Sequence, residues 1–124
     1  MEELGARERQ IMDAVYRLGR PGVREVLEDL PDDLHYSTVR TMLNKLAEKG
    51  HLRRIADGRR YRYVPTTPKP VEQRTTLRRV IRNLFDGSAA RAMATLLDLD
   101  ARRLTEEELD ELTRRIEDLR RRGE

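Results

Sequence analysis

Residues 35–64 read HYSTVRTMLNKLAEKGHLRRIADGRRYRYV, and this stretch decides the fold. Apolar residues recur in it at helical spacing, which predicts a helix over residues 37–49 with one apolar face. Ser37 is expected to cap the start of this helix through its side-chain oxygen, and Gly50 is expected in a left-handed conformation just past its end. The residues of the apolar face are Val39, Leu43 and Leu46.

A basic hairpin is expected to follow this helix. Residues 51–55 and 60–64 flank the tetrapeptide ADGR at 56–59, and an Asp-Gly pair is a strong signal for a tight turn between two strands. Arginines stand in both flanking segments and in the turn. A helix followed at once by an arginine-rich hairpin is typical of a winged helix, and it favours duplex DNA as the partner.

Two shorter helices are predicted before this unit. Residues 6–18 and 23–30 each carry an apolar stripe at helical spacing, and the sequence GRPG at 19–22 separates them. Three short helices and a hairpin give a mainly α fold, namely a winged helix-turn-helix domain with a small β-hairpin wing.

A linker and three further helices are predicted beyond the hairpin. Residues 65–70 contain three prolines, which favour an extended and semi-rigid connection. Apolar stripes predict helices over residues 71–85 and 89–99, the first closed by Asp-Gly and the second capped by a serine. A last helix is expected to begin with the capping box formed by Thr105 and Glu108.

The last three helices are expected to form a homodimer. They hold roughly 45 residues, too few to bury three apolar stripes well without a partner. Two copies related by a two-fold axis would cover the stripes; the alternative is that these helices fold back on the N-terminal half. We therefore expect a winged-helix DNA-binding domain over residues 1–67 and a helical dimerisation region over 68–124. The residues predicted in the dimer interface are Leu77, Val80, Ile81, Leu84, Phe85, Met93, Leu96, Leu97, Leu109, Leu112, Ile116 and Leu119.

Charge is unevenly distributed along the chain. Residues 34–64 carry eight basic and two acidic residues, a net charge of +6, although the whole chain carries only +3. Residues 1–33, by contrast, carry five basic and nine acidic residues. Positive charge concentrated on the helix and hairpin is typical of a surface that binds phosphate.

Composition argues against several other classes of protein. The chain has no cysteine, so a disulfide framework and a thiolate metal site are ruled out. No apolar run approaches the ~18 residues of a membrane span, and the polar N-terminus is unlike a secretory signal, so no membrane partner and a cytoplasmic location are expected. The sequence offers no glycine-rich phosphate loop or catalytic constellation. It therefore predicts no enzyme activity, no cofactor and no bound metal.

The polar face of the helix over residues 37–49 is the predicted DNA reader. Arg40 is the best candidate for a base contact, because a guanidinium can bond guanine O6 and N7 together. With Ser37 as the cap, Arg40 would be the third helical residue, where a cation opposes the helix dipole. Tyr61 and Tyr63 are expected to pack under the helix, while arginines of the hairpin grip the phosphate backbone. The predicted DNA contacts are Ser37, Thr38, Arg40, Thr41, Lys45, Arg54, Arg59, Arg60 and Arg62.

Two other functions stay open at this point. A winged helix can serve as a protein-interaction module without any role on DNA. A weaker alternative is a metal-dependent regulator that uses His35, His51 and nearby acids, although neither histidine stands at ligand spacing from another.

The chain resembles the penicillinase-repressor family, the BlaI/MecI-type regulators. The resemblance rests on YSTVRTML at 36–43, LAEKG at 46–50 and the wing residues GR at 58–59 and YRYVP at 61–65. Weaker matches continue through VREV at 23–26, LFDGS at 84–88 and residues 104–112.

This resemblance implies a homodimeric repressor on a palindromic operator, often of TACA/TGTA type, with DNA read by the helix over residues 37–49. It also implies an upstream sensor or protease, whose identity the sequence does not give. Penicillinase-type members are cleaved at an Asn-Phe bond in the fifth helix, which aligns near Thr95-Leu96, and no Asn-Phe pair occurs here. Copper-responsive relatives use a Cys-x-Cys motif, which is absent because the chain lacks cysteine.

Overall fold

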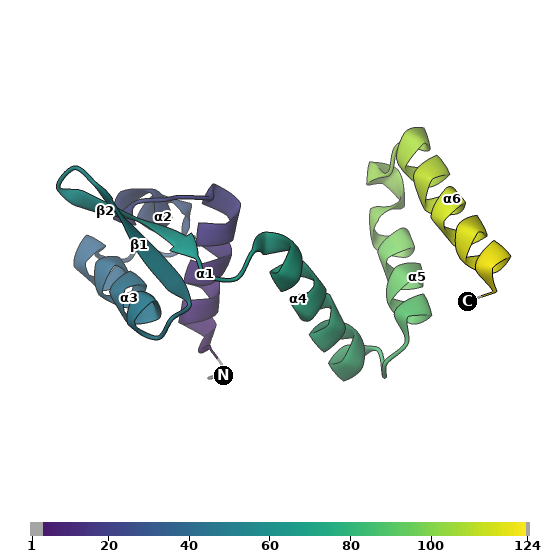
Figure 1. Cartoon of the computed structure of the whole chain (residues 1–124), viewed down its shortest axis with the longest axis horizontal. Coiled ribbons are helices and arrows are strands. Elements are labelled where there is room, and N and C mark those ends of the chain that lie inside the picture. Colours follow the sequence, from purple (N-terminus) through teal and green to yellow (C-terminus); the bar gives the residue numbers. More distant parts are fainter. Residues whose placement is uncertain (1–3, 124) are drawn as a thin grey trace. The chain divides into compact units, whose positions relative to one another are not determined.

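The computed structural model describes residues 4–123, which form six α-helices, a short 3-10 helix and two strands (Figure 1). The chain divides into two compact units, Met1–Thr75 and Thr76–Glu124. In chain order the elements are α1 (Ala6–Leu18), α2 (Val23–Asp29), α3 (Tyr36–Glu48), β1 (Leu52–Asp57), β2 (Arg60–Pro65), α4 (Lys69–Leu84), α5 (Ala89–Asp100), η1 (Ala101–Arg103) and α6 (Glu106–Arg122). The predicted winged helix-turn-helix fold is confirmed, with its hairpin wing directly after α3.

The core of the first unit lies between α1, α2, α3 and the base of the hairpin. Each helix contributes the apolar stripe that its sequence spacing predicts, and Leu52 and Tyr63 close the core from the two strands. Tyr63 is only 1% exposed, and its hydroxyl donates a hydrogen bond to Asn44 Oδ1 at 2.8 Å. The other buried members of the core are Ile11, Met12, Ala14, Val15, Val23, Val26, Leu30, Val39, Leu43 and Leu46.

The start of α3 differs from the prediction. His35 is the residue before the first helical turn, and its carbonyl accepts hydrogen bonds from the amides of Thr38 and Val39. Ser37 is therefore the second residue inside the helix and does not cap it. Arg40 is accordingly the fifth helical residue, so the predicted conflict between its charge and the helix dipole was wrong.

The end of α3 agrees with the prediction. Gly50 has φ +88°, its amide bonds to the Ala47 carbonyl at 3.1 Å, and the His51 amide bonds to the Leu46 carbonyl at 2.9 Å. This pair of bonds satisfies carbonyls at the helix end and turns the chain sharply into β1. The local sequence therefore sets the direction in which the hairpin leaves α3.

The hairpin strands pair antiparallel in a register that sets Asp57 opposite Arg60. The two-residue turn is therefore Gly58-Arg59, with φ +63° at Gly58, which is the arrangement of a type II′ turn with glycine first. Each strand is one residue longer than predicted, and Asp57 of the predicted Asp-Gly turn is the last residue of β1. The expectation that both tyrosines pack under α3 was wrong for Tyr61, which is 51% exposed near the tip of the wing.

The second unit keeps the predicted caps. Ser88 Oγ accepts a hydrogen bond from the Arg91 amide at 3.1 Å, and Thr105 and Glu108 form the reciprocal capping box of α6 at 3.1 and 2.9 Å. Helix α4 begins at Lys69, two residues before the predicted start, because Pro70 is tolerated in the first helical turn. The connection between wing and helix is correspondingly shorter than the proline content suggested.

The second unit has no buried core of its own among the described residues. None of the residues in α4, α5 or α6 is buried, and Leu84 is 75% exposed. No helix within residues 4–123 has the length and apolar character needed to cross a membrane.

Candidate nucleic-acid interface

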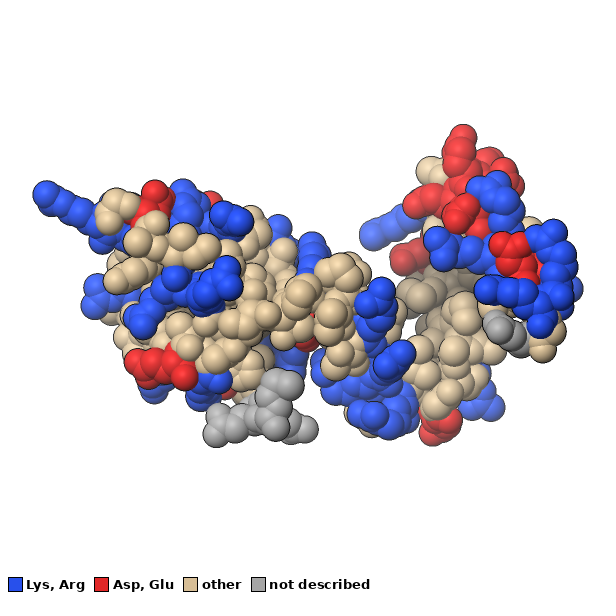
Figure 2. Space-filling view, in the orientation of Figure 1, with Lys and Arg blue, Asp and Glu red and all other residues tan. Residues whose placement is uncertain are grey.

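A groove of about 510 Å³ lies between α3, the wing and the start of α2. Five arginines and two carboxylates are among its lining residues, so the groove carries a net positive charge. Figure 2 shows lysine and arginine side chains gathered over the hairpin on the face drawn. The lining residues are Gly22, Val23, Arg24, Glu25, Tyr36, Arg40, Asn44, Asp57, Arg59, Arg60, Tyr61, Arg62 and Tyr63.

One stripe of α3 faces this groove. Tyr36, Arg40 and Asn44 are spaced at i, i+4 and i+8, so they lie above one another on the side of the helix next to the wing. Arg40 is exposed. Of the α3 residues predicted to contact DNA, Arg40 is the one that lines the groove.

The other predicted α3 contacts lie outside the groove. Ser37, Thr41 and Lys45 form a second stripe at the same spacing, next to the first, and Thr38 lies at the far edge of the exposed face. All four are exposed, as is Arg40. The predicted polar face of the helix therefore consists of two stripes, one that lines the groove and one that faces outward.

The wing supplies most of the remaining cations. Arg54, Arg59 and Arg60 are exposed, and the last two line the groove. The Arg54 guanidinium lies over the Tyr61 ring, 5.5 Å from its centroid, and also contacts Asn44 Oδ1 at 3.5 Å. Arg54 therefore links the exposed end of the wing to the recognition helix.

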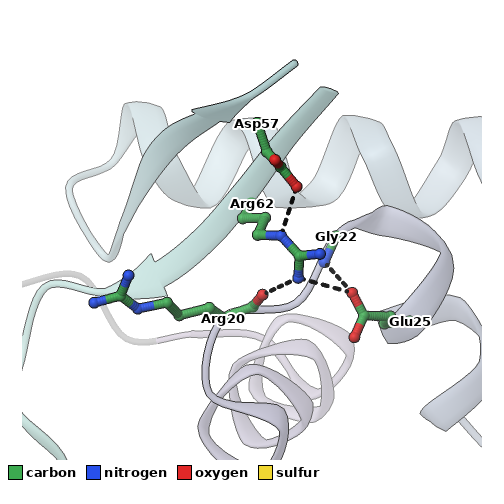
Figure 3. Close-up of polar contacts among 5 residues, drawn as sticks. All are labelled: Arg20, Gly22, Glu25, Asp57 and Arg62. Atoms are coloured by element: carbon green, nitrogen blue, oxygen red, sulfur yellow. Dashed lines mark hydrogen bonds and ion pairs between the residues drawn. The ribbon is translucent and has the colours of Figure 1, made fainter. Parts of the chain in front are cut away.

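Arg62 differs from the other wing arginines because its guanidinium is engaged within the protein (Figure 3). Its Nε donates to Asp57 Oδ2 at 2.8 Å, and its Nη1 donates to Glu25 Oε1 at 3.2 Å and to the Arg20 carbonyl at 2.9 Å. The hydrogen bond and charge of Asp57, followed by the charge of Glu25, raise the pKa of Arg62. Both carboxylates of the groove are thus paired with this one arginine.

Three groove residues were missed by the sequence analysis. Arg24 extends over the Tyr36 ring, with its guanidinium carbon 5.3 Å from the ring centroid, and Asn44 accepts the hydrogen bonds from Tyr63 and Arg54. The spacing of Tyr36 and Asn44 on either side of Arg40 was the available signal. Arg24 had no such signal, because only the fold brings the start of α2 beside α3.

Burial also marks the base of the groove. Tyr63 loses contact with water in the core, and this desolvation raises the pKa of its hydroxyl, although the nearby charges of Arg54 and Arg40 oppose the shift. The Tyr63 hydroxyl donates its hydrogen bond to Asn44 Oδ1, which fixes the Asn44 side chain at the base of the groove. The base of the groove is neutral and fixed, while its rim is cationic.

A recognition helix beside an arginine-rich wing, with exposed cations on both, defines a winged-helix transcriptional regulator. The chain matches the penicillinase repressor family over residues 4–118, and it therefore belongs to that family. Membership places it among DNA-binding transcriptional repressors, a class that is not enzymatic. The resemblance stated from the sequence is confirmed.

Two individual relatives are similar in sequence. The chain is 41% identical over 68 residues to the transcriptional regulator BlaI of Mycobacterium tuberculosis, covering 52% of this chain and 49% of that protein. It is 26% identical over 98 residues to an uncharacterised 16.5 kDa protein of Latilactobacillus sakei, covering 77% of this chain and 67% of that protein. The chain thus spans about half the length of the BlaI regulator it matches.

Two solved structures are similar. The PcaV transcriptional regulator from Streptomyces coelicolor, in complex with its natural ligand, has a TM-score of 0.50 at 24% identity, over 82% of this chain and 74% of that one. The BlaI monomer of Bacillus licheniformis, in complex with the blaP half-operator, has a TM-score of 0.48 at 24% identity, over 55% of this chain and 85% of that one. The likeness to PcaV is one of fold.

Metal ligands do not gather anywhere in residues 4–123, where no group of three or more histidine, aspartate or glutamate side chains could hold an ion. The two histidines stand apart in the fold. His35 precedes α3, and His51 follows it at the start of the hairpin.

Proposed function

We propose that this protein represses transcription as a homodimer on a palindromic operator, each chain reading one half-site. The observation that carries the proposal is the cationic groove between α3 and the wing, flanked by the outward polar stripe of α3. A recognition helix of this kind lies in the major groove, and a wing reaches the neighbouring backbone or minor groove. A dimer would block promoter access while it occupies both half-sites.

Separate roles follow for the residues of the interface. Arg40 is the proposed base reader, and Thr41 contacts a thymine methyl or a phosphate from the adjacent stripe. Ser37, Thr38 and Lys45 are proposed to contact phosphate around the helix, and Arg54, Arg59 and Arg60 to contact it from the wing. Arg24 joins them from α2, because it lines the same groove.

The apolar stripes of the second unit support the dimer. The large apolar side chains of α4, α5 and α6 are exposed or only half-buried in the single chain, and none belongs to the core of the first unit. Exposed apolar surface of this extent marks an interaction site. A second copy would cover it with the same residues on both sides of a two-fold axis. The proposed division into a DNA-binding domain over 1–67 and a dimerisation region over 68–124 follows from these roles.

A repressor that acts on DNA inside the cell fits the cytoplasmic location expected from the sequence, and we propose that location. The signal that releases the operator would come from an upstream sensor or protease.

Selection of bound fragments from a random duplex library tests this function. We expect enrichment of an inverted repeat whose half-sites are centred about one helical turn, ~10 base pairs, apart. Binding should weaken steeply as salt rises, because phosphate contacts release counterions.

Two outcomes would contradict the proposal. Enrichment of a single half-site without symmetry would argue against the dimer on a palindrome. No enrichment at low salt, together with a stable complex with another protein, would favour the interaction-module alternative.

A further inference from the structure

We propose that Arg62 is a positioning residue that clamps the wing to the helical body and neutralises two carboxylates in the DNA-facing groove. The proposal replaces the phosphate contact expected of Arg62 from the sequence, and it rests on the proposed function only for its effect on DNA. The claim that Arg62 holds the wing against the helices concerns the protein without DNA.

The clamp joins three separate segments of the chain. Arg62 lies on β2, Asp57 ends β1, and Glu25 stands in the first turn of α2 (Figure 3). Asp57 and Arg62 are diagonal neighbours on one face of the hairpin, since Asp57 pairs with Arg60. One guanidinium thus ties the tip of the wing to its middle and to the body.

The body side of the clamp is itself fixed. Glu25 Oε1, which accepts from Arg62, also accepts from the Gly22 amide at 3.0 Å. The Arg20 carbonyl, the third acceptor, belongs to the same connection between α1 and α2. Arg62 therefore bonds to a connection whose shape is already held by Glu25.

Among the described residues, few other polar contacts join the outer part of the wing to the helices. Nearer its base the Tyr63 amide bonds to the Pro21 carbonyl at 2.9 Å and the Tyr63 side chain is buried in the core. On the side facing α3, Arg54, which pairs with Tyr63 across the hairpin, donates a long hydrogen bond to Asn44 Oδ1 at 3.5 Å. Arg62 is therefore the main polar tie of the outer wing to α1 and α2 among the described residues.

The geometry also sets Arg62 apart from phosphate-binding arginines. Two of its three guanidinium nitrogens already donate to protein oxygens, and only Nη2 carries no bond of the described network. Arg59 and Arg60 have no such carboxylate partners within residues 4–123. Removing Arg62 would leave Asp57 and Glu25 unpaired in a groove that must accept a polyanion.

The experiment compares wild type, Arg62→Ala, Arg60→Ala and a triple variant that adds Asp57→Asn and Glu25→Gln to Arg62→Ala. Circular dichroism first establishes that each variant is folded, which is expected because Arg62 lies outside the core. Amide hydrogen exchange of the wing is then measured without DNA, and affinity for the selected operator is measured at graded salt.

We expect Arg62→Ala to speed exchange in the outer wing several-fold, while Arg60→Ala leaves exchange unchanged. Operator affinity should fall about tenfold in Arg62→Ala and recover most of that loss in the triple variant, since the unpaired acids are gone. The salt slope should stay near the wild-type value in the triple variant but become shallower by about 0.9 in Arg60→Ala.

Unchanged amide exchange of the wing in Arg62→Ala would overturn the clamp. It would also be overturned, in favour of a direct phosphate contact, if the triple variant recovered no operator affinity and its salt slope were shallower than wild type by about 0.9. If wild type itself bound no operator, the proposed function would fail, while faster exchange in Arg62→Ala would still support the clamp.

Discussion

Arginines of the first unit fall into two groups according to what they touch. Arg7 and Arg17 each pair with an aspartate, at 2.7 and 2.6 Å, and Arg62 pairs with two acids. Arg40, Arg59 and Arg60 lie on the groove without a carboxylate partner in the described part of the chain. A cation without a carboxylate partner on a folded surface is available to an outside anion such as a phosphate.

Base reading and backbone binding should separate between two of these arginines. Arg40→Ala is expected to relax sequence preference and cost about 1–3 kcal/mol against the best operator, because a guanine contact is lost. Arg60→Ala should weaken all duplexes about equally. Fluorescence anisotropy with the operator and with point-substituted operators measures both. Arg103→Ala, which removes the same charge from η1, is the matched control.

An Arg40→Ala variant that keeps its full site preference would contradict this assignment. The base reader would then be sought on the outward stripe, at Thr41 or Lys45.

Residue types and spacing predicted which arginines are exposed, but not how Ser37 and Arg62 are engaged. The exposed positions of Arg40 and Arg60 followed from helical and strand periodicity, and that of Arg59 followed from its place in the predicted turn. Ser37 was placed at the cap because serine favours that position, whereas His35 takes it through its backbone carbonyl alone. The engagement of Arg62 could not be foreseen, since its partner Glu25 lies 37 residues away and meets it only in the fold.

Elements whose ends are set locally were predicted best. The glycine after α3, the serine before α5 and the capping box of α6 act within a few residues, so the sequence contains the whole interaction. Tyr61 and Tyr63 show the opposite case. Both occupy alternate positions of one strand, but the hairpin rises away from the body and only the residue nearer its base is buried.

The contact between α1 and the segment after the wing predicts a pH effect. Tyr16 donates its hydroxyl to the Thr67 carbonyl at 2.9 Å, and burial, with a smaller effect of Glu72, raises the pKa of Tyr16 to about 12. The fold favours the neutral form of the Tyr16 hydroxyl. The resulting contribution to the free energy of unfolding is complete below the ordinary tyrosine pKa near 10, and it is lost as pH rises toward 12.

Absorbance titration of tyrosinate measures this effect. The tyrosinate absorbance of wild type minus that of Tyr16→Phe should rise with pH with a midpoint near 12. A midpoint near pH 10 would mean that the Tyr16 hydroxyl is not shielded from water in the fold.

Helix α6 allows a test of the dimer that leaves the DNA reader untouched. Leu109, Leu112, Ile116 and Leu119 form its apolar seam, and Asp110 lies on the opposite face. Leu112→Gln should weaken dimerisation at least about tenfold, because replacing a leucine buried at the interface costs a few kcal/mol of binding free energy in each copy. Asp110→Gln introduces the same residue and should leave the dimer intact, as sedimentation equilibrium would measure.

Equal association of wild type and Leu112→Gln would place the seam outside any dimer. That result would favour the alternative in which the three helices pack on their own N-terminal half.

At the scale of the whole molecule, the two units differ in their core and in their surface. The first has a complete core and a cationic interface, while the second has apolar stripes and no buried residue within the described helices. Within α6, acidic residues gather toward the start of the helix and arginines toward its end, as Figure 2 shows. The helix dipole favours this arrangement. We propose that a second copy covers these apolar stripes, which would also bring two recognition helices to the same operator.

Site-specific cross-linking tests the central claim, that duplex DNA lies along α3 and the wing. Because the chain has no cysteine, single substitutions can be labelled with a photo-activated cross-linker without background. Thr41→Cys on α3 and Arg59→Cys at the wing turn are compared, on the selected operator, with Asp13→Cys on α1 of the same unit. We predict that Thr41→Cys and Arg59→Cys cross-link to the operator and that Asp13→Cys does not; DNA adducts from Asp13→Cys alone would contradict the account.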